Sequence, residues 1–320
     1  MSESTASGTL PRKGFSFDWR RDIIYVGFVA VIIIFSILLR DQGFLSTASF
    51  WNILRQAAIV SVIAVGMTLV IAAAEIDLSV GSVAGLASVV TAMTLSQFGL
   101  IPGILAGILL GVVIGSINGA LVAFARIPSF LVTLAMMGIA FGIAQWVTQS
   151  APVPILDMTY VANFGGGTIG PIPGLIIWML LFVAAGTILL KKMRFGRQIL
   201  ATGANPVAAE YSGINTAWVR FRVMLLCSTG AAVAGMLYAG RLQSGRFQWG
   251  SGDEMNAIAA VILGGTALAG GKGSVIGTFF GALLMATINY GLILAGLDTS
   301  QQKIIQGIII ILAVALARKK

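Results

Sequence analysis

Residues 57–74 read AAIVSVIAVGMTLVIAAA and contain no charged side chain over 18 positions. A helix needs about 20 apolar residues to cross the hydrocarbon core of a bilayer, so this stretch is long enough for one span. The whole chain has the same character, because 58% of its 320 residues are hydrophobic, 10% are charged and the mean hydropathy is +0.97. A soluble domain carries about 25% charged residues. The composition therefore predicts an integral membrane protein.

Further stretches of similar length predict an all-α, polytopic helical bundle of about ten spans. The expected spans are 23–39, 57–74, 78–95, 100–125, 130–147, 174–190, 223–239, 255–269, 275–294 and 299–317. The eighth is short and could be re-entrant, and the long fourth could be split, so eight to eleven spans fit the sequence. Residues 1–22 are expected to form a polar cytoplasmic tail, and 23–320 a single transmembrane domain with a loop at 191–222.

Basic residues are distributed unevenly over this topology. Fifteen of the twenty lie in inner segments, and five lie in outer segments: Arg40, Arg55, Arg241, Arg246 and Lys303. The positive-inside rule then places both termini in the cytoplasm and loop 148–173 outside. The net charge of +9 reflects this topology rather than a nucleic-acid partner. The sequence has no histidine, which excludes histidine-dependent catalytic triads, haem ligation and histidine zinc motifs.

A weak internal repeat suggests two inverted halves. The segment GVVIGSINGAL (111–121) resembles GTFFGALLMATINYGL (277–292), with glycines four apart followed by Ile-Asn. Each segment follows a span introduced by two acidic residues. An offset of five spans gives the copies opposite orientation, as in inverted-repeat transporters. Chance similarity in a sequence rich in glycine, alanine and isoleucine is the alternative.

The acidic residues in AAAEIDLSVGS (72–82) lie between two apolar runs without a polar loop. A carboxylate at the bilayer centre costs about 2.5–3.5 kcal/mol, and retained acids usually face a water-filled path or a partner. We therefore expect Asp77, Ser79 and Ser82 to line a substrate path at a helix break. Alternatively, Asp77 caps the next helix through amides near Ser79, and Glu75 belongs to a turn. The other pathway candidates, polar residues in or beside spans, are Asn118, Ser129 and Asn289.

The glycine-rich segment LGGTALAGGKGSVIG (263–277) is not a phosphate-binding loop. Lys272 is followed by glycine rather than by Ser or Thr, and Thr266 stands where the first glycine is required. We expect a tight turn between packed helices.

The inner loop contains ANPVAAEYSG (204–213), whose pattern predicts a short helix. Asn205 can cap it, Pro206 fits its first turn and Gly213 ends it. So short a helix is not stable alone in water. The segment must therefore dock against the membrane surface or against protein.

Four segments resemble the permease subunits of bacterial ribose-type ABC importers. They are EIDLSVGS (75–82), INGALVAFARIPSFLVTL (117–134), FGRQILATGANPVAAEYSGIN (195–215) and AIAAVILGGTALAGGKGSVIGTFFGALL (257–284). The first usually reads GGIDLSVGS in that family, and here Ala74 and Glu75 replace the two glycines.

The resemblance implies an inner-membrane permease that dimerises, with a second copy of this chain as the expected partner in a homodimer, and that forms the path for a monosaccharide or polyol. A periplasmic binding protein would deliver the sugar, and a separate ATP-binding subunit would hold ATP and Mg²⁺, so that this chain binds no cofactor. The residues implied to couple the chain to that ATPase are Asn205, Pro206, Ala208, Ala209 and Gly213.

Two other functions fit less of the sequence. An ion-coupled secondary transporter would have to bind its ion with Glu75 and Asp77, and the docking loop would then be unexplained. An intramembrane enzyme without histidine would need a Ser–Lys pair, and Lys272 with Ser274 lies in a glycine turn.

Overall fold

The computed structural model of the chain describes residues 19–318, so most of the expected tail 1–22 lies outside the described residues. Most of the described part is helical and very little of it is strand, as predicted. Its helices are α1 (Trp19–Leu38), α2 (Thr47–Ala72), α3 (Val80–Phe98), α4 (Leu100–Ala123), α5 (Ser129–Thr148), α6 (Met158–Asn163), α7 (Gly174–Lys192), α8 (Arg194–Ala204), α9 (Pro206–Tyr211), α10 (Thr216–Leu242), α11 (Asp253–Leu263), α12 (Val275–Leu294) and α13 (Thr299–Arg318), with a 3-10 turn at Arg40–Gln42.

Seven of the described helices are long and apolar enough to cross a membrane: α2, α3, α4, α5, α7, α10 and α12. In α1 the apolar helix runs over Val26–Leu38. Helix α11 has 11 residues. At 1.5 Å per residue its length is about 16 Å, roughly half of the hydrocarbon core. A multi-pass helical membrane protein is thus confirmed, and α11 corresponds to the span that the sequence marked as short.

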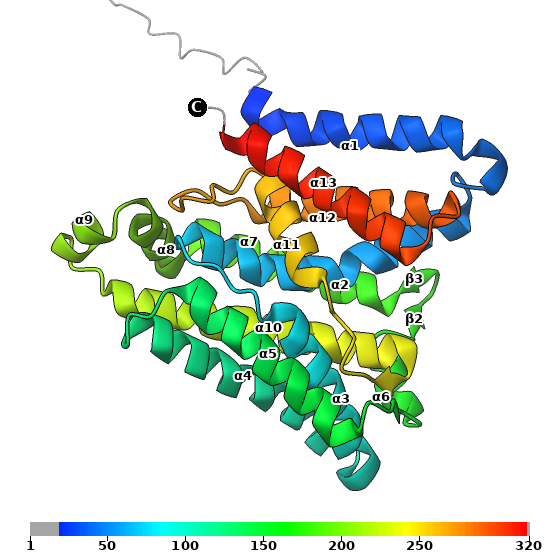
Figure 1. Cartoon of the computed structure of the whole chain (residues 1–320), viewed down its shortest axis with the longest axis horizontal. Coiled ribbons are helices and arrows are strands. Elements are labelled where there is room, and N and C mark those ends of the chain that lie inside the picture. The colour runs from blue at the N-terminus through cyan, green and yellow to red at the C-terminus, as the bar shows by residue number, and fades with distance from the viewer. Residues whose placement is uncertain (1–18, 319–320) are drawn as a thin grey trace, which may run out of the picture.

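The long helices run between two ends of the bundle (Figure 1). Helices α8 and α9 lie at one end, and α6 with the short strands β2 (Thr168–Ile169) and β3 (Ile172–Pro173) lies at the other. The beginning of α1 and the end of α13 both point toward the end that carries α8 and α9.

The end opposite α8 and α9 is closed by the segment between α5 and α7. Strand β1 (Val153–Pro154) pairs with β4 (Ser244–Gly245), which follows α10, and β2 pairs with β3 as a hairpin. Tyr160 of α6 is fully buried and donates its hydroxyl to the carbonyl of Met236, at 2.8 Å. These contacts hold the segment between α5 and α7 against α10.

Helices α2 and α10 form the centre of the bundle, and both are buried over most of their length. Glycines allow the backbones to approach closely. A Cβ on Gly66 of α2 would lie 2.9 Å from Cα of Cys227 in α10, and a Cβ on Gly115 of α4 would lie 2.8 Å from Cα of Leu225. The high glycine content therefore serves helix packing.

Two non-helical segments enter the bundle. Residues 73–79 connect α2 to α3, and residues 243–252 connect α10 to α11 (Figure 1). The second segment packs against the first two turns of α3, where a Cβ on Gly85 would lie 3.0 Å from the carbonyl oxygen of Trp249. Both α3 and α11 thus begin inside the bundle rather than at its surface.

Candidate functional site: a helix break and a cytoplasmic-loop helix

The break between α2 and α3 is organised by Asp77. Its side chain is fully buried. Oδ1 accepts a hydrogen bond from the Ser79 amide at 2.9 Å and another from the Ser79 hydroxyl at 2.6 Å. The carboxylate therefore binds the amide of the residue just before α3, as the capping alternative from the sequence placed it near Ser79.

Side chains from two other helices complete this polar cluster. Asn118 of α4 donates Nδ2 to the Ser79 hydroxyl at 3.1 Å, and Ser228 of α10 donates its hydroxyl to Asp77 Oδ2 at 3.4 Å. Both residues are buried. The cluster joins α3, α4 and α10 at the break, and in this conformation Asp77 is closed off from solvent. Its role in a substrate path stays a prediction.

Ser129 lies next to the same break, at the beginning of α5. Its hydroxyl accepts a hydrogen bond from the Ile76 amide at 3.2 Å, and the Thr133 hydroxyl donates to the Ile76 carbonyl at 3.5 Å. The extended backbone of 73–79 thereby obtains partners that a helix would have provided. Ser82 is buried in the first turn of α3.

Asn289 belongs to a different part of the bundle. Its Oδ1 accepts a hydrogen bond from Gln306 of α13 at 2.8 Å. No hydrogen bond in the described part of the chain connects it to the cluster at Asp77. Of the six pathway candidates, the structure brings Asp77, Ser79, Asn118 and Ser129 together, places Ser82 one turn away and separates Asn289.

The unusual Glu75 faces the beginning of α10. Its Oε1 lies 3.0 Å from Nε of Arg220, and both side chains are partly exposed. The Nε–H is not aligned for a hydrogen bond, so the contact is electrostatic. The residue before it, Ala74, has a φ of 63°, in the left-handed region that favours glycine.

The expected loop helix is present as α9. The Asn205 side chain accepts a hydrogen bond from the Ala208 amide at 3.0 Å, Pro206 is the first helical residue, and Gly213 follows with a φ of 81°. These interactions are the predicted cap, first turn and stop. The helix has six residues, fewer than the segment that was expected to be helical.

The two alanines of α9 do not face the same way. Ala208 is exposed, whereas Ala209 is 4% exposed and packs against the chain itself. Ala209 is therefore on the inward side of α9, because a short helix lying on the bundle turns one side toward it, and the role of both alanines in coupling stays a prediction. The outward surface is formed by Val207, 60% exposed, and Tyr211, 90% exposed.

Helix α8 connects this surface to the bundle. A Cβ on Gly203 would clash with the carbonyl oxygen of Ala72, the last residue of α2, and would lie 2.7 Å from the Gly271 amide. Gly271 itself donates its amide to Ala72 at 3.0 Å. The glycine-rich segment 263–277 is therefore a tight turn between packed elements, as predicted, and α8 rests on the end of α2 just before the break.

Three features of the site were not predicted: helix α8, the Ser228 contact and the Glu75–Arg220 pair. The sequence of α8, RFGRQILATGA, is amphipathic, and its helical periodicity could have been recognised. The other two contacts join residues more than 140 positions apart, and no local pattern identifies such partners.

Comparison with known proteins assigns the chain to a transport family. Residues 49–314 match the family model described as the permease component of branched-chain amino acid transport systems. The ribose import permease of Bacillus subtilis (strain 168) is 40% identical over 298 residues, covering 92% of each chain. The ribose import permease of Escherichia coli (strain K12) is 36% identical over 329 residues, covering all of both chains.

The similarity extends to other import systems. The autoinducer 2 import system permease of Yersinia enterocolitica is 34% identical over 291 residues, which cover 88% of this chain and 79% of that protein. No solved structure matches the chain significantly.

Proposed function

The chain belongs to this family of ABC-importer permease components, and from that membership we propose that it forms the membrane path for a monosaccharide or polyol of the ribose type. It is not an enzyme, because in this family a separate subunit hydrolyses ATP. Two relatives that match it over nearly their whole length are ribose import permeases, which supports the proposed substrate class.

The structural observation that carries the proposal is the outward surface of α9. Val207 and Tyr211 are exposed apolar side chains at the end of the bundle that carries the inner loop. A six-residue helix cannot be stable alone, and a large exposed aromatic residue at its tip is typical of a contact with another protein. We propose that the ATP-binding subunit docks here, through the segment that contains Asn205, Pro206, Ala208 and Gly213, with Ala209 positioning α9 on the bundle.

We further propose ten membrane segments, with both termini in the cytoplasm. The seven long apolar helices would be joined by α1, the half-length α11 and α13. The beginning of α1 and the end of α13 point toward the end with α8 and α9, where most of the basic residues lie. The positive-inside rule supports a cytoplasmic location for that end.

The arrangement of helices supports two inverted halves, α2–α5 and α10–α13. In each half a long helix leads into a non-helical segment and then into a helix that begins inside the bundle, α3 or α11. The halves interlock, because α3 and α4 pack on α10 while α11 and α12 pack on α2. Helices α3 and α11 leave the centre toward opposite ends (Figure 1). Such discontinuous helices near the midplane form the substrate sites of inverted-repeat transporters.

The remaining partners follow from the proposed assembly. A second copy of this chain would complete the path as a homodimer, and a periplasmic sugar-binding protein would deliver the substrate from the end that carries α6. ATP and Mg²⁺ would be held by the ATP-binding subunit.

The mechanism would be alternating access. Closure of the ATPase would move α9, and α8 would transmit the movement to the end of α2 through its contact with Ala72. The segment 73–79 would follow, because Glu75 is paired with Arg220 at the beginning of α10 and Asp77 holds the beginning of α3. Rigid helices would then tilt about the break, as in other two-state transitions.

Reconstitution in liposomes tests this function. We expect labelled D-ribose to accumulate only when the permease, its ATP-binding subunit, the binding protein and ATP are all present. Ionophores that dissipate proton and sodium gradients should not reduce the uptake. Uptake by the permease alone in response to an ion gradient would instead identify an ion-coupled secondary transporter.

A further inference from the structure

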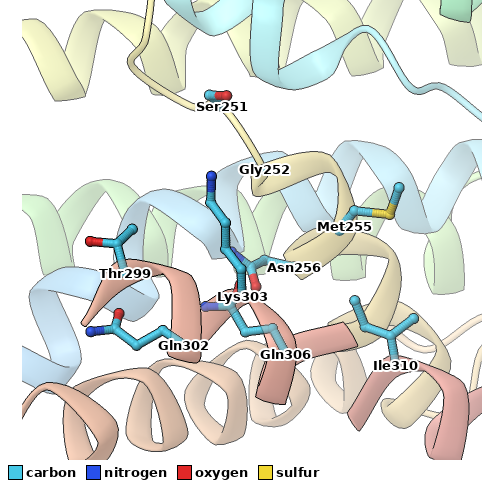
Figure 2. A pocket seen from close by; sticks show the side chains of 9 residues that line it. All are labelled: Ser251, Gly252, Met255, Asn256, Thr299, Gln302, Lys303, Gln306 and Ile310. Atoms are coloured by element: carbon cyan, nitrogen blue, oxygen red, sulfur yellow. The ribbon is translucent and has the colours of Figure 1, made fainter. Parts of the chain in front are cut away.

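A pocket lined by both polar and apolar residues lies between α11 and α13, apart from the cluster at Asp77. Figure 2 shows its lining, and its volume is about 370 Å³. Pockets for small ligands have volumes of about 300–1,000 Å³. The pocket is therefore large enough for one small molecule. Six of its lining residues are polar: Ser251, Asn256, Thr299, Gln302, Lys303 and Gln306.

Helix α13 presents two different faces. Thr299, Gln302 and Gln306 follow one side at spacings of three and four residues and line the pocket. Ile304 and Ile308 are exposed on another side. Polar side chains in a membrane segment are costly when they face lipid, so they face protein or a water-filled cavity. The polar face of α13 thus marks an aqueous cavity next to the beginning of α11.

The polar groups in the pocket are held in place but retain free hydrogen-bonding capacity. Gln306 donates to Asn289 at 2.8 Å, and Gln302 donates to the carbonyl of Leu297 at 2.8 Å. Asn256 Oδ1 is buried and accepts no hydrogen bond from the described part of the chain. A buried acceptor without a partner is costly, and a ligand hydroxyl can satisfy it.

The charge of the pocket indicates the class of ligand. Amide and hydroxyl groups can each donate and accept, which matches the hydroxyls of a neutral polyol. Among the described lining residues there is no carboxylate and the charged one is Lys303, so a cation would find no counter-charge. The Lys303 side chain extends from α13 toward Gly252 at the beginning of α11 and supplies further donors (Figure 2).

We propose that this pocket is a contact site for the transported molecule, an uncharged monosaccharide or polyol, on its way into the membrane path. Asn256, Gln302 and Gln306 bind its hydroxyls, and Lys303 donates to one of them. The assignment rests on the proposed transport function and gives Asn289 an indirect role, because Asn289 positions the amide of Gln306.

Accessibility to water can be measured without any substrate. The one cysteine, Cys227, is buried. Single cysteines introduced as Gln302→Cys and Gln306→Cys would be treated with a membrane-impermeant thiosulfonate, with Ile304→Cys and Ile308→Cys on the exposed apolar face as controls. We expect the pocket cysteines to react at least about tenfold faster, because only a hydrated thiol ionises readily. Equal rates on the two faces would overturn the aqueous pocket.

Transport of D-ribose by the complete reconstituted complex tests the role of the pocket. We expect Asn256→Leu and Gln302→Leu to lower the initial uptake rate by about five- to tenfold, because each removes a hydrogen-bonding group. The control is Gln301→Leu, since Gln301 also makes a local hydrogen bond, to the Asp298 amide at 3.0 Å, but does not line the pocket. Copurification of the ATP-binding subunit should be the same for all three variants.

The two proposals fail in different ways. If the unmodified chain transports ribose and both pocket variants match Gln301→Leu, the pocket assignment is wrong while the transport function stands. If the unmodified complex transports no monosaccharide or polyol, the proposed function itself is wrong, and with it the identity of the pocket ligand.

Discussion

The carboxylate of Glu75, just after α2, lies 3.0 Å from Nε of Arg220 in the first turn and a half of α10. The pair joins the non-helical segment 73–79 to the helix that follows the proposed docking loop. Both side chains are partly exposed, so the pair contributes only about 0.2–1 kcal/mol to the free energy of unfolding. Its importance would lie in transmitting movement rather than in stability.

Neutralising either member of this pair should therefore uncouple the complex more than it destabilises the chain. We expect Glu75→Gln and Arg220→Gln each to lower the amount of ribose transported per ATP hydrolysed, with only a small change in Tm. The exchanged double variant Glu75→Arg with Arg220→Glu should recover part of the coupling. Identical coupling ratios in the unmodified chain and in both single variants would contradict a role in transmission.

Glycine should suit the backbone conformation at position 74 better than the alanine that is there. Its φ of 63° lies in the left-handed region, where a side chain costs about 1–2 kcal/mol. Glycine removes that cost but loses about 0.5–1 kcal/mol through the greater freedom of the unfolded chain. We expect Ala74→Gly to raise Tm slightly or leave it unchanged, and Ala74→Val to lower it clearly. A thermal shift assay in detergent measures both, and a large fall in Tm for Ala74→Gly would contradict this backbone geometry.

Because some helices pack closely and others do not, we expect replacement of glycine by alanine to affect folding differently at two positions. A Cβ on Gly235 of α10 would clash with the carbonyl oxygen of Ala84 in α3, whereas a Cβ on Gly142 of α5 meets nothing within 4 Å. Overpacking costs about 1–3 kcal/mol. We expect Gly235→Ala to reduce the yield of folded protein in size-exclusion chromatography and Gly142→Ala to leave it unchanged. Equal yields would show that α3 and α10 are not in such close contact.

Asp77 supports both a structural and a transport prediction. Asp77→Ala removes the acceptor for the Ser79 amide and should cost about 1–3 kcal/mol. We expect it to lower uptake while the complex still assembles. Asp77→Ser restores a capping oxygen but not the contact with Ser228. Full uptake by Asp77→Ser would show that capping is the whole role of Asp77, and low uptake with normal stability would support a role in the path.

Much of the fold could be predicted because the membrane imposes simple rules. Every span expected from apolar length corresponds to a helix, and the cap, first turn and stop of α9 depend on Asn205, Pro206 and Gly213, which act within a few residues. The short length of 255–269 also indicated a span that could be re-entrant, and α11, with 11 residues, is long enough to cross only part of the bilayer.

The site was less predictable because it depends on contacts between distant segments. The sequence indicated a polar break at Asp77, but the approach of Asn118 and Ser228 depends on how α4 and α10 pack on α3. Similarly, Asn256 and Gln302 are 46 positions apart and meet only because α13 folds back beside α11. The inward orientation of Ala209 depends on how α9 lies on the bundle, and residue size could not reveal it.

Variants that test the proposed docking surface must change residues of α9 that are exposed in the structure. Because Ala209 is buried, Ala209→Glu would disturb the packing of α9 as well as any partner contact. Val207→Glu and Ala208→Glu place a charge on the outward side instead. Leu156→Glu is the matched control, since Leu156 is exposed near the opposite end of the bundle, between β1 and α6.

The most direct test of the account is ATP-driven D-ribose uptake by the reconstituted complex carrying Val207→Glu, compared with Leu156→Glu, together with copurification of the ATP-binding subunit. A charge in the centre of a contact surface typically costs several kcal/mol of binding, so we predict that Val207→Glu loses both the subunit and the uptake. Leu156→Glu should retain both. Normal subunit association and uptake by Val207→Glu, at normal expression, would contradict the claim that a separate ATPase drives this permease through α9.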